Sequence, residues 1–265
     1  MTSSNRPADT PAGAPVPSPI RVAVLGARGR MGSAAVRAVE AADDLELVAA
    51  IGSDDDRETA REAGAQVVID LTVPAVTKDN VLWAIDAGMH AVVGATGWDE
   101  SSLGEVRAAL EGAPGLGVLI APNFAIGAVL AMRFAETAAR FYESAEIVEL
   151  HHPDKVDAPS GTAKHTAAAI ARGRAEGDLG PVPDATQKDP DGSRGAVVDG
   201  VHVHAVRLRG LVAHEEILFG GTGEQLTIRH DSFDRVSFMP GVLLGVREVA
   251  SHPGLTVGLE HYLGL

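Results

Sequence analysis

The segment from Ile20 to Glu40, IRVAVLGARGRMGSAAVRAVE, most constrains the fold of this chain. A continuous apolar run ends in glycines at positions 26, 29 and 32, and an alanine-rich helical pattern follows at once. Such a run is typical of a buried strand, and glycines permit a tight turn into a helix. Backbone N–H groups of the turn and the helix N-terminus can bind a pyrophosphate. This strand–turn–helix context favours dinucleotide binding over a purely structural turn.

The alternation of apolar runs and helical segments continues beyond this turn. Further strands are expected at residues 45–52, 65–72, 90–97 and 116–123. Helices are expected between them at residues 75–88 and at about 99–111, the first closed by a C-terminal glycine. Because strands alternate with helices, right-handed βαβ units and a parallel sheet covered on both faces follow. We therefore predict a doubly wound, Rossmann-like α/β domain.

The pattern changes after Asn123. A helical segment of residues 125–142 leads into the strand AEIVELHH, and a second helix begins after Ser160. A loop rich in Gly, Pro and Asp, from Gly177 to Gly200, is long enough to be functional or mobile. The alternating runs VHVHAVRLR, HEEILFGG and EQLTIRHD then follow without helices between them, before a last helix at GVLLGVREVA. These runs favour a mixed, largely antiparallel sheet in a second, α+β domain.

The composition limits the classes of partner. Of the 265 residues, 45% are hydrophobic and 22% are charged, which suffices for a sizeable core, and the formal net charge is −14. Nucleic acid and anionic membranes need a basic surface, so neither is expected as the main partner. An anionic small molecule would need a local basic pocket. No cysteine occurs, which excludes disulfides, thiolate catalysis and Cys-ligated metals.

The first 18 residues, MTSSNRPADTPAGAPVPS, contain no apolar run of the kind that a signal peptide needs. They are rich in Pro, Ala, Ser and Thr, so we expect a disordered tail. No stretch of the chain approaches the ~20 apolar residues of a membrane span. Together with the lack of cysteine, these features favour a cytoplasmic protein.

The stretch ELHHPDKVDAPSGTAK concentrates groups that can transfer protons or bind anions. His151 and His152 end the strand, and they should point to opposite faces because side chains alternate along a strand. In one interpretation a histidine and Lys155 act on a bound substrate. In the other, the histidines only cap the strand and Lys155 pairs with Asp154 or Asp157. The density of polar groups beside a helix start favours the first interpretation.

Ser160 is well placed as the N-cap of the helix that follows this turn. The backbone N–H groups of Gly161 and Thr162 would then face outward as an anion site, which the helix dipole strengthens. A histidine that can donate a proton near neutral pH, a lysine and a helix N-terminus together suit a substrate that bears carboxylates.

Two other pairs of polar residues receive a structural interpretation. His202 and His204 share one strand face, but no third ligand is compelling, so a solvated or intersubunit face is favoured and no metal is assigned. Glu215 and Glu216 are interpreted as the edge of a strand rather than as an acid/base pair.

The end of the second strand, AAIGSDDD, bears on the choice of cofactor. A dinucleotide fold usually carries an acidic residue there for the adenosine ribose, but this chain has Gly52, and its first acid is Asp54. Arg28 and Arg30, in the glycine turn, could instead meet a 2′-phosphate. Both NADH and NADPH therefore stay open as cofactors.

The blocks GARGRMG, GATGW, APNFAIG and ELHHPDKVDAPSGTA resemble those of the dihydrodipicolinate reductase family, the 4-hydroxy-tetrahydrodipicolinate reductases of bacterial lysine biosynthesis. The similarity runs from about Ile20 to the C-terminus, includes RGLVAHEEILFG and TIRHDSFDR, and is closest to actinobacterial members. It implies that NADH or NADPH delivers a hydride to an unsaturated six-membered nitrogen heterocycle with two carboxylates. The product would be tetrahydrodipicolinate, in the diaminopimelate route to lysine.

The resemblance also implies roles for single residues. His151 would be the proton donor and Lys155 its catalytic partner. The carboxylates of a small dicarboxylate substrate would be bound by His152, Ser160, Gly161 and Thr162. The cofactor would be held by three segments: Gly26, Ala27, Arg28, Gly29, Arg30, Met31 and Gly32; Gly94, Ala95 and Thr96; and Ala121, Pro122, Asn123 and Phe124.

This chain departs from the family pattern at two positions. Asp154 stands where a third basic residue is common, which puts a negative charge near the expected dicarboxylate site. Gly52 stands where an acid is usual, which leaves the preference between NAD and NADP open.

A split organisation is a further implication of the resemblance. Residues 19–124 and 234–265 would form the dinucleotide-binding domain, and residues 125–233 the substrate-binding and tetramerisation domain. Hinge closure between them would bring nicotinamide to substrate and exclude water. A homotetramer is therefore expected.

Two alternatives stay open. A nicotinamide-dependent dehydrogenase of another amino-acid-derived carboxylate would turn over other substrates. A noncatalytic dinucleotide sensor would bind the cofactor without using a proton donor, and the stretch of histidines and lysine argues against it.

Overall fold

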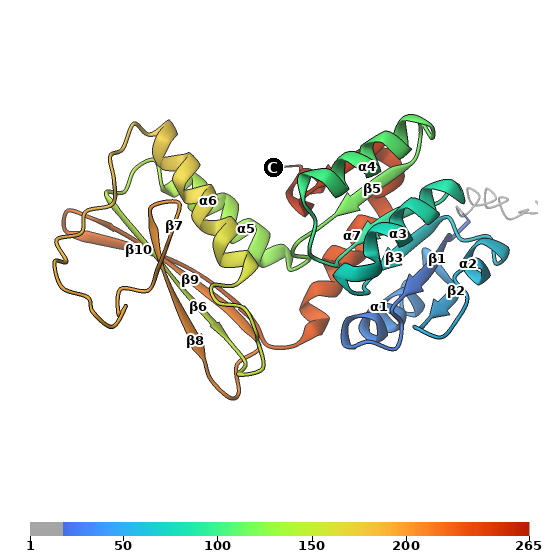
Figure 1. Cartoon of the computed structure of the whole chain (residues 1–265), viewed down its shortest axis with the longest axis horizontal. Helices are drawn as coiled ribbons and strands as arrows, with labels where there is room; N and C mark the ends of the chain where they lie inside the picture. The colour runs from blue at the N-terminus through green and yellow to red at the C-terminus, as the bar shows by residue number, and fades with distance from the viewer. Residues whose placement is uncertain (1–17, 265) are drawn as a thin grey trace, which may run out of the picture.

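The structure, a computed structural model, describes residues 18–264. Two sheets, each covered by helices, lie side by side (Figure 1). The tail expected for residues 1–18 falls, except for Ser18, outside the described residues. Within the described part of the chain, no helix combines the length and the apolar character that crossing a membrane requires.

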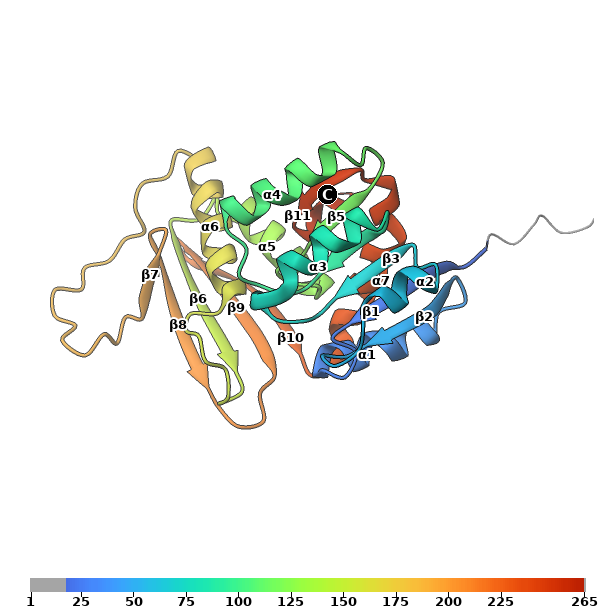
Figure 2. The same cartoon turned by 45° about the vertical axis from the view of Figure 1, so that its right-hand side comes forward.

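The first sheet is entirely parallel, with the strand order β11-β5-β4-β3-β1-β2. This confirms the predicted doubly wound, Rossmann-like fold. The last strand of the chain pairs with β5, so the C-terminal segment returns to this sheet (Figure 2). Its strands are β1 (Ile20–Leu25), β2 (Leu45–Ile51), β3 (Val67–Asp70), β4 (His90–Val93), β5 (Gly117–Ile120) and β11 (Gly254–Val257).

Apolar clusters on both faces of the first sheet explain why its strands are continuous apolar runs. On one face, Val22 and Val24 pack with the buried sides of α1 and α7. On the other, Val68 and Val93 pack with α2, α3 and α4. The short helix α2 was not predicted from the sequence. These helices are α1 (Arg30–Glu40), α2 (Glu58–Glu62), α3 (Pro74–Asp86), α4 (Glu100–Glu111) and α7 (Met239–Glu248).

The second sheet is mixed, with the strand order β10-β9-β6-β8-β7. Only β6 and β8 pair in parallel and the other neighbours are antiparallel, which confirms the predicted mixed, largely antiparallel sheet. Its strands are β6 (Ser144–His151), β7 (Ala196–Val198), β8 (Val201–Arg207), β9 (Ala213–Gly221) and β10 (Glu224–Ser232).

Two helices, α5 (Ile126–Ala138) and α6 (Gly161–Glu176), pack on one face of the second sheet. Ile147, Ile217 and Phe219 of the sheet are fully buried against them. Part of the loop expected at residues 177–200 is ordered as β7, which pairs with β8. Short 3-10 turns η1 (Arg235–Phe238), η2 (Val249–Ser251) and η3 (Leu259–Tyr262) flank α7 and end the described chain.

Candidate active site

The glycine turn closes tightly around the start of α1. Gly26 has φ +77°, a conformation that favours glycine. A Cβ on Gly32 would come within 2.0 Å of the carbonyl oxygen of Gly26, so a larger residue would push α1 away from the turn. Gly29 is the N-cap of α1. The turn therefore brings the N-terminus of α1 to the carboxyl end of β1, as expected for a pyrophosphate site.

A first cavity of about 620 Å³ lies at the carboxyl ends of β1, β2 and β3. Gly26, Arg28 and Gly29 of the turn line it, together with Gly52 after β2 and Asn80 on α3. This position, beside the glycine turn and the end of the second strand, is where an open parallel sheet binds the adenosine half of a dinucleotide.

Arg28 and Asp55 form an ion pair at the wall of this first cavity. Nη2 of Arg28 lies 2.9 and 2.8 Å from the carboxylate oxygens of Asp55, one of which also accepts the backbone N–H of Gly52 at 2.8 Å. The Gly52 N–H and then Arg28 hold the pKa of Asp55 below its usual value. Asp55 therefore supplies an acid just beyond the position that Gly52 occupies. It is paired with Arg28, the arginine that could meet a 2′-phosphate.

A second cavity of about 290 Å³ lies where the two sheets approach each other. Leu71 and Thr72 line both cavities, so a ligand can extend from the glycine turn into the second cavity. Residues from both sheets enclose it: Met31, Gly94, Ala121, Pro122, Asn123 and Phe124 on one side, and His151, Ser160, Thr162, Ala213, Glu215, His230 and Ser232 on the other.

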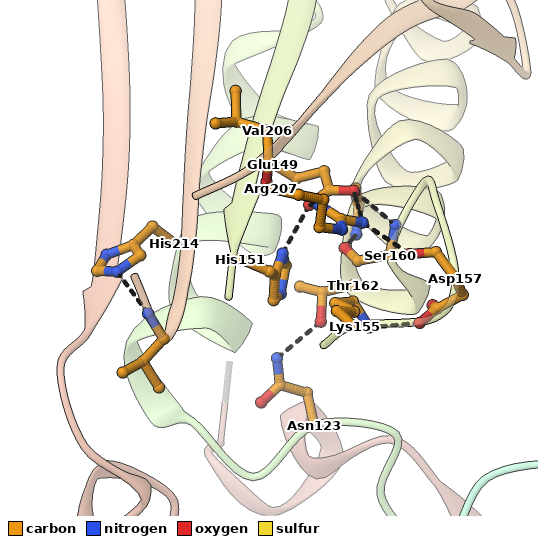
Figure 3. A network of polar contacts seen from close by, with 12 residues as sticks. Asn123, Glu149, His151, Lys155, Asp157, Ser160, Thr162, Val206, Arg207 and His214 are labelled. Atoms are coloured by element: carbon orange, nitrogen blue, oxygen red, sulfur yellow. Dashed lines mark hydrogen bonds and ion pairs between the residues drawn. The ribbon is translucent and has the colours of Figure 1, made fainter. Parts of the chain in front are cut away.

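His151, at the end of β6, is oriented by a buried carboxylate (Figure 3). Its Nδ1 lies 2.6 Å from Oε2 of Glu149, two residues earlier on the same strand. Arg207, from β8, binds both oxygens of Glu149 at 2.7 and 2.8 Å, and the backbone N–H of Ser160 donates to Oε1 at 3.1 Å. Because Nδ1 points to Glu149, Nε2 of His151 is directed away from it and can exchange a proton with a ligand.

Glu149 is fully buried. Burial alone would raise its pKa, but the hydrogen bonds from His151 and Arg207 outweigh this effect and lower the pKa to about 2. A buried carboxylate with this set of partners is a fixed negative charge at all physiological pH values. It can therefore hold His151 in one orientation and one tautomer.

The loop between β6 and α6 holds Lys155 outside the lining of the second cavity. Nζ of Lys155 lies 2.7 Å from Oδ1 of Asp157, which is one of the two acids proposed as its structural partner (Figure 3). Arg207 Nη2 donates to the backbone carbonyl of Asp157 at 2.6 Å, so the same arginine fixes Glu149 and this loop. His152 also lies outside the lining, and Asp154 is exposed to solvent.

The N-terminus of α6 faces the same cavity. Ser160 is the N-cap, as predicted, and its hydroxyl accepts the backbone N–H of Ala163 at 3.1 Å. Asn123, after β5, donates from Nδ2 to the hydroxyl of Thr162 at 3.0 Å (Figure 3). This bond joins the loop that ends the first sheet to the helix of the second sheet. Gly161 does not line the cavity, but its neighbours Ser160 and Thr162 do.

The residues expected at the cofactor divide between the two cavities. Gly26, Arg28 and Gly29 line the first, and Met31, Gly94 and the four residues 121–124 line the second. The remaining five line neither cavity: Ala27, Arg30, Gly32, Ala95 and Thr96. Three of these are buried behind the turn and the strand end, where they support the lining, and the other two are exposed.

The histidine pair of β8 lies beside carboxylates. Nε2 of His204 lies 2.7 Å from Glu146, and Nε2 of His202 lies 3.1 Å from Asp184. Arg194 also pairs with Glu146. Among residues 18–264 there is no group of three or more side chains placed to hold a metal ion.

The interpretation of Glu215 and Glu216 as a strand edge is wrong for both residues. β9 lies inside the sheet, between β10 and β6, and its successive side chains face opposite sides. Glu215 is buried and lines the second cavity, whereas Glu216 lies on the other face and pairs with Arg229 at 2.6 Å. The hairpin to β10 is local, but β6, the strand on the other side of β9, lies far earlier in the chain, so the local sequence cannot show that β9 has a partner on both sides.

Four residues of the site were not predicted from the sequence: Glu149, Arg207, Glu215 and His230. For Glu149 a signal was available, since a residue two positions before His151 on a strand shares its face. Arg207 reaches the site only because β8 pairs in parallel with β6, which places it opposite His151.

Two family models match nearly the whole described chain. The model described as "Dihydrodipicolinate reductase, N-terminus" matches residues 20–124, and that described as "Dihydrodipicolinate reductase, C-terminus" matches residues 127–263. The boundary between them falls at the start of α5.

Similar proteins are found among curated sequences and among solved structures. A 4-hydroxy-tetrahydrodipicolinate reductase of Streptomyces griseus is 63% identical over 248 residues, which are 94% of this chain and 99% of that protein. One of Cutibacterium acnes is 63% identical over 93% of this chain and 99% of that protein. The structure of a dipicolinate-bound dihydrodipicolinate reductase from Paenisporosarcina sp. TG-14 superposes with a TM-score of 0.80 at 38% identity, over 92% of this chain and 99% of that one.

Proposed function

This chain belongs to the dihydrodipicolinate reductase family, and we propose that it reduces 4-hydroxy-tetrahydrodipicolinate to tetrahydrodipicolinate in the diaminopimelate route to lysine. Water is lost, and the substrate gains a hydride and a proton. The two family models and the similar curated proteins confirm the resemblance deduced from the sequence blocks. They also confirm the expectation of a pyridine-nucleotide-dependent reductase. The observation that carries the proposal is His151, oriented by Glu149, in the wall of a cavity opposite the loops expected to hold the cofactor.

The residues present fit a nicotinamide dinucleotide. The first cavity lies at the glycine turn, where the close approach of Gly32 to Gly26 leaves the helix N-terminus accessible, and it adjoins the second cavity at Leu71 and Thr72. Gly26, Arg28 and Gly29 would hold the adenosine and pyrophosphate half, and the residues around Gly94 and Phe124 the other half. When bound, the reduced nicotinamide supplies the hydride.

His151 would supply the proton. Its Nδ1 is fixed on the Glu149 carboxylate, so a proton delivered to substrate leaves from Nε2. The permanent negative charge of Glu149 stabilises the protonated ring before transfer, and the bidentate Arg207 keeps Glu149 in place. Glu149 and Arg207 are therefore positioning residues, and His151 is the group that touches the substrate.

The N-terminus of α6 would bind a substrate carboxylate. Ser160 and Thr162 line the cavity, and the backbone N–H groups of Gly161 and Thr162 open a helix of 16 residues. His152 and Lys155, in the adjacent loop, would reach the substrate only if this loop moves toward α6 when substrate binds. We infer that the ammonium of Lys155 then leaves Asp157 and pairs with the substrate.

The predicted roles of the two domains are consistent with this arrangement. We infer that residues 19–124 and 234–265 bind the cofactor and that residues 125–233 bind the substrate, with closure about the loop that carries Asn123. The Asn123–Thr162 hydrogen bond would then be a contact that closure tightens. The homotetramer and the cytoplasmic location stay predictions. Light scattering on the purified protein would measure the oligomeric state.

The two alternatives predict different results in the same assay. A dehydrogenase of another amino-acid-derived carboxylate would oxidise cofactor with that compound instead, and a sensor would bind the cofactor without turnover. A buried carboxylate that fixes a histidine at a cavity has a use in proton transfer but none in sensing, which favours the enzyme.

The absorbance of reduced nicotinamide tests the proposal directly. Freshly generated 4-hydroxy-tetrahydrodipicolinate is added to the protein with NADH or NADPH in parallel. We expect oxidation that depends on the substrate, and a strong decrease in turnover for His151→Ala with nearly unchanged cofactor affinity. Folded protein that binds the cofactor but shows no substrate-dependent oxidation would contradict the function, and normal turnover of His151→Ala would contradict the assigned proton donor.

A further inference from the structure

Glu215 lies in the floor of the second cavity, in a row of side chains across three strands. It is directly opposite Glu149 of β6 on one side and His230 of β10 on the other, so the three share one face of the sheet. Glu215 lines the cavity together with His151 and His230, and only 5% of its surface is exposed. Two glutamates are thus immediate neighbours on a buried face.

The hydrogen bonds around Glu215 indicate that it carries a proton. Oγ1 of Thr166, on α6, lies 2.8 Å from Oε2 of Glu215 and 3.1 Å from the carbonyl oxygen of Thr162. A threonine hydroxyl has a single hydrogen and cannot donate to both oxygens. Both contacts are satisfied if Glu215 donates to Thr166 and Thr166 donates to the carbonyl. The other oxygen, Oε1, is buried and has no hydrogen-bond partner among the described residues, which costs much less for a neutral acid than for a carboxylate.

The surroundings of Glu215 oppose a negative charge there. Burial, together with the charge of Glu149, raises its pKa to about 7, although the hydrogen-bonding contact with Thr166 acts in the opposite direction. From β10, His230 offers little positive charge, because burial lowers its pKa. The residues that α5 and α6 add to this cavity are apolar or uncharged, and the other titratable groups that line it are His151 and His214. Arg207 is committed to Glu149.

We propose that Glu215 is held as a neutral carboxylic acid and thereby sets the affinity of this cavity for a dicarboxylate. While Glu215 is neutral, the two carboxylates of the ligand meet the histidines and the N-terminus of α6, and the charge of the neighbouring Glu149 is balanced by Arg207. When Glu215 ionises, it adds a second carboxylate beside Glu149 and repels the ligand. The inference rests on the proposed function, because that function supplies the dianionic ligand.

Infrared spectroscopy tests the protonation state without any ligand. The wild-type protein should show the carbonyl stretching band of a buried carboxylic acid at pH 6, and this band should vanish by pH 9. The band should be missing from Glu215→Gln at both pH values and present in Glu216→Gln. The control removes the neighbouring charge from the other face of the sheet. A wild-type spectrum without this band at pH 6 would overturn the proposal, even if the variants failed to fold.

Calorimetric titration with dipicolinate tests the effect on binding. Between pH 6 and 9 the wild-type dissociation constant should rise, approaching about tenfold per pH unit above the titration of Glu215. The rise should be much smaller for Glu215→Gln and unchanged for Glu216→Gln. Titration of the histidines contributes equally to all three proteins and cancels in the comparison. Parallel profiles for all three would overturn the inference alone, whereas a lack of binding by all three would contradict the proposed substrate and the inference with it.

Discussion

Nδ1 of His151 lies 2.6 Å from Oε2 of Glu149, and the two residues are separated by a single position on one strand. Alternation along the strand places both side chains on the cavity face. Arg207, opposite His151 on β8, then fixes the carboxylate from the side. A local sequence relationship thus builds the pair, and a parallel strand pairing holds it rigid.

Replacing Glu149 by Gln should impair catalysis more than binding. An amide cannot fix the imidazole as a carboxylate does, so we expect kcat to fall about 100-fold, within the range that acid–base catalysis contributes, with KM for substrate little changed. Steady-state kinetics on Glu149→Gln and on a control variant measures kcat and KM. The matched control is Glu146→Gln, on the same strand, which removes a carboxylate that also pairs with a histidine and an arginine. A kcat close to wild type, from a variant that melts cooperatively, would refute the positioning role.

Gly161→Val should raise KM and leave the fold intact. A Cβ at Gly161 would meet no atom within 4 Å, so the substitution starts in open space, and we expect the added methyl groups to cover the N–H groups of the helix start. Loss of a charge-assisted hydrogen bond is worth ~1.5–3 kcal/mol, so we expect KM for substrate to rise about tenfold or more. Gly104→Val, on α4, has equally open surroundings and should leave KM unchanged. An unchanged KM in Gly161→Val would remove this helix N-terminus from the substrate site.

Arg28→Ala should change the choice of cofactor. If Arg28 turns from Asp55 to a 2′-phosphate, its removal lowers kcat/KM for NADPH by about tenfold, the worth of one charge-assisted contact, and for NADH much less. The ratio of the two efficiencies is measured in parallel assays. Arg37→Ala, in the last turn of α1, removes the same charge outside the first cavity. An equal decrease with both cofactors would show that Arg28 does not recognise the phosphate.

Glu215→Gln should stabilise the protein at alkaline pH. The pKa of Glu215 is raised from 4.5 to about 7, so the folded chain binds more protons than the unfolded chain within this window. The stability contributed by Glu215 is therefore complete below about pH 4.5 and is lost as the pH rises toward 7. The shift corresponds to about 3 kcal/mol. The Tm difference between variant and wild type should widen from pH 5 to pH 8. A constant difference would contradict the protonated state.

Much of the fold follows from the sequence because its signals are local. The continuous apolar runs, the glycine turn at Gly26 and the cap at Ser160 each depend on neighbouring residues, and each element forms as predicted. The alternating runs after Gly200 likewise predicted strands with one covered face. The short helix α2 lacks the length for a periodic signal, and β7 is stabilised by its pairing with β8 rather than by its own three residues.

The site was less predictable because it depends on contacts between distant residues. Nothing near Arg207 in sequence shows that it will bind Glu149, 58 positions earlier, and nothing near Glu215 shows that its strand is interior. The pairing of Lys155 with Asp157 was one of two stated alternatives, and local spacing could not decide between ion pair and catalysis. Long-range strand pairing therefore brings to the site residues that the local motif does not contain.

Isotope transfer shows whether the hydride of the cofactor reaches the proposed product. The protein is incubated with 4-hydroxy-tetrahydrodipicolinate and NADH or NADPH that carries deuterium at the transferable C4 position, and the product is examined by mass spectrometry. We expect tetrahydrodipicolinate one mass unit heavier than the product formed with unlabelled cofactor, and almost none from His151→Ala in the same time. Product without the label, or oxidised cofactor without this product, would contradict the proposed reduction of 4-hydroxy-tetrahydrodipicolinate.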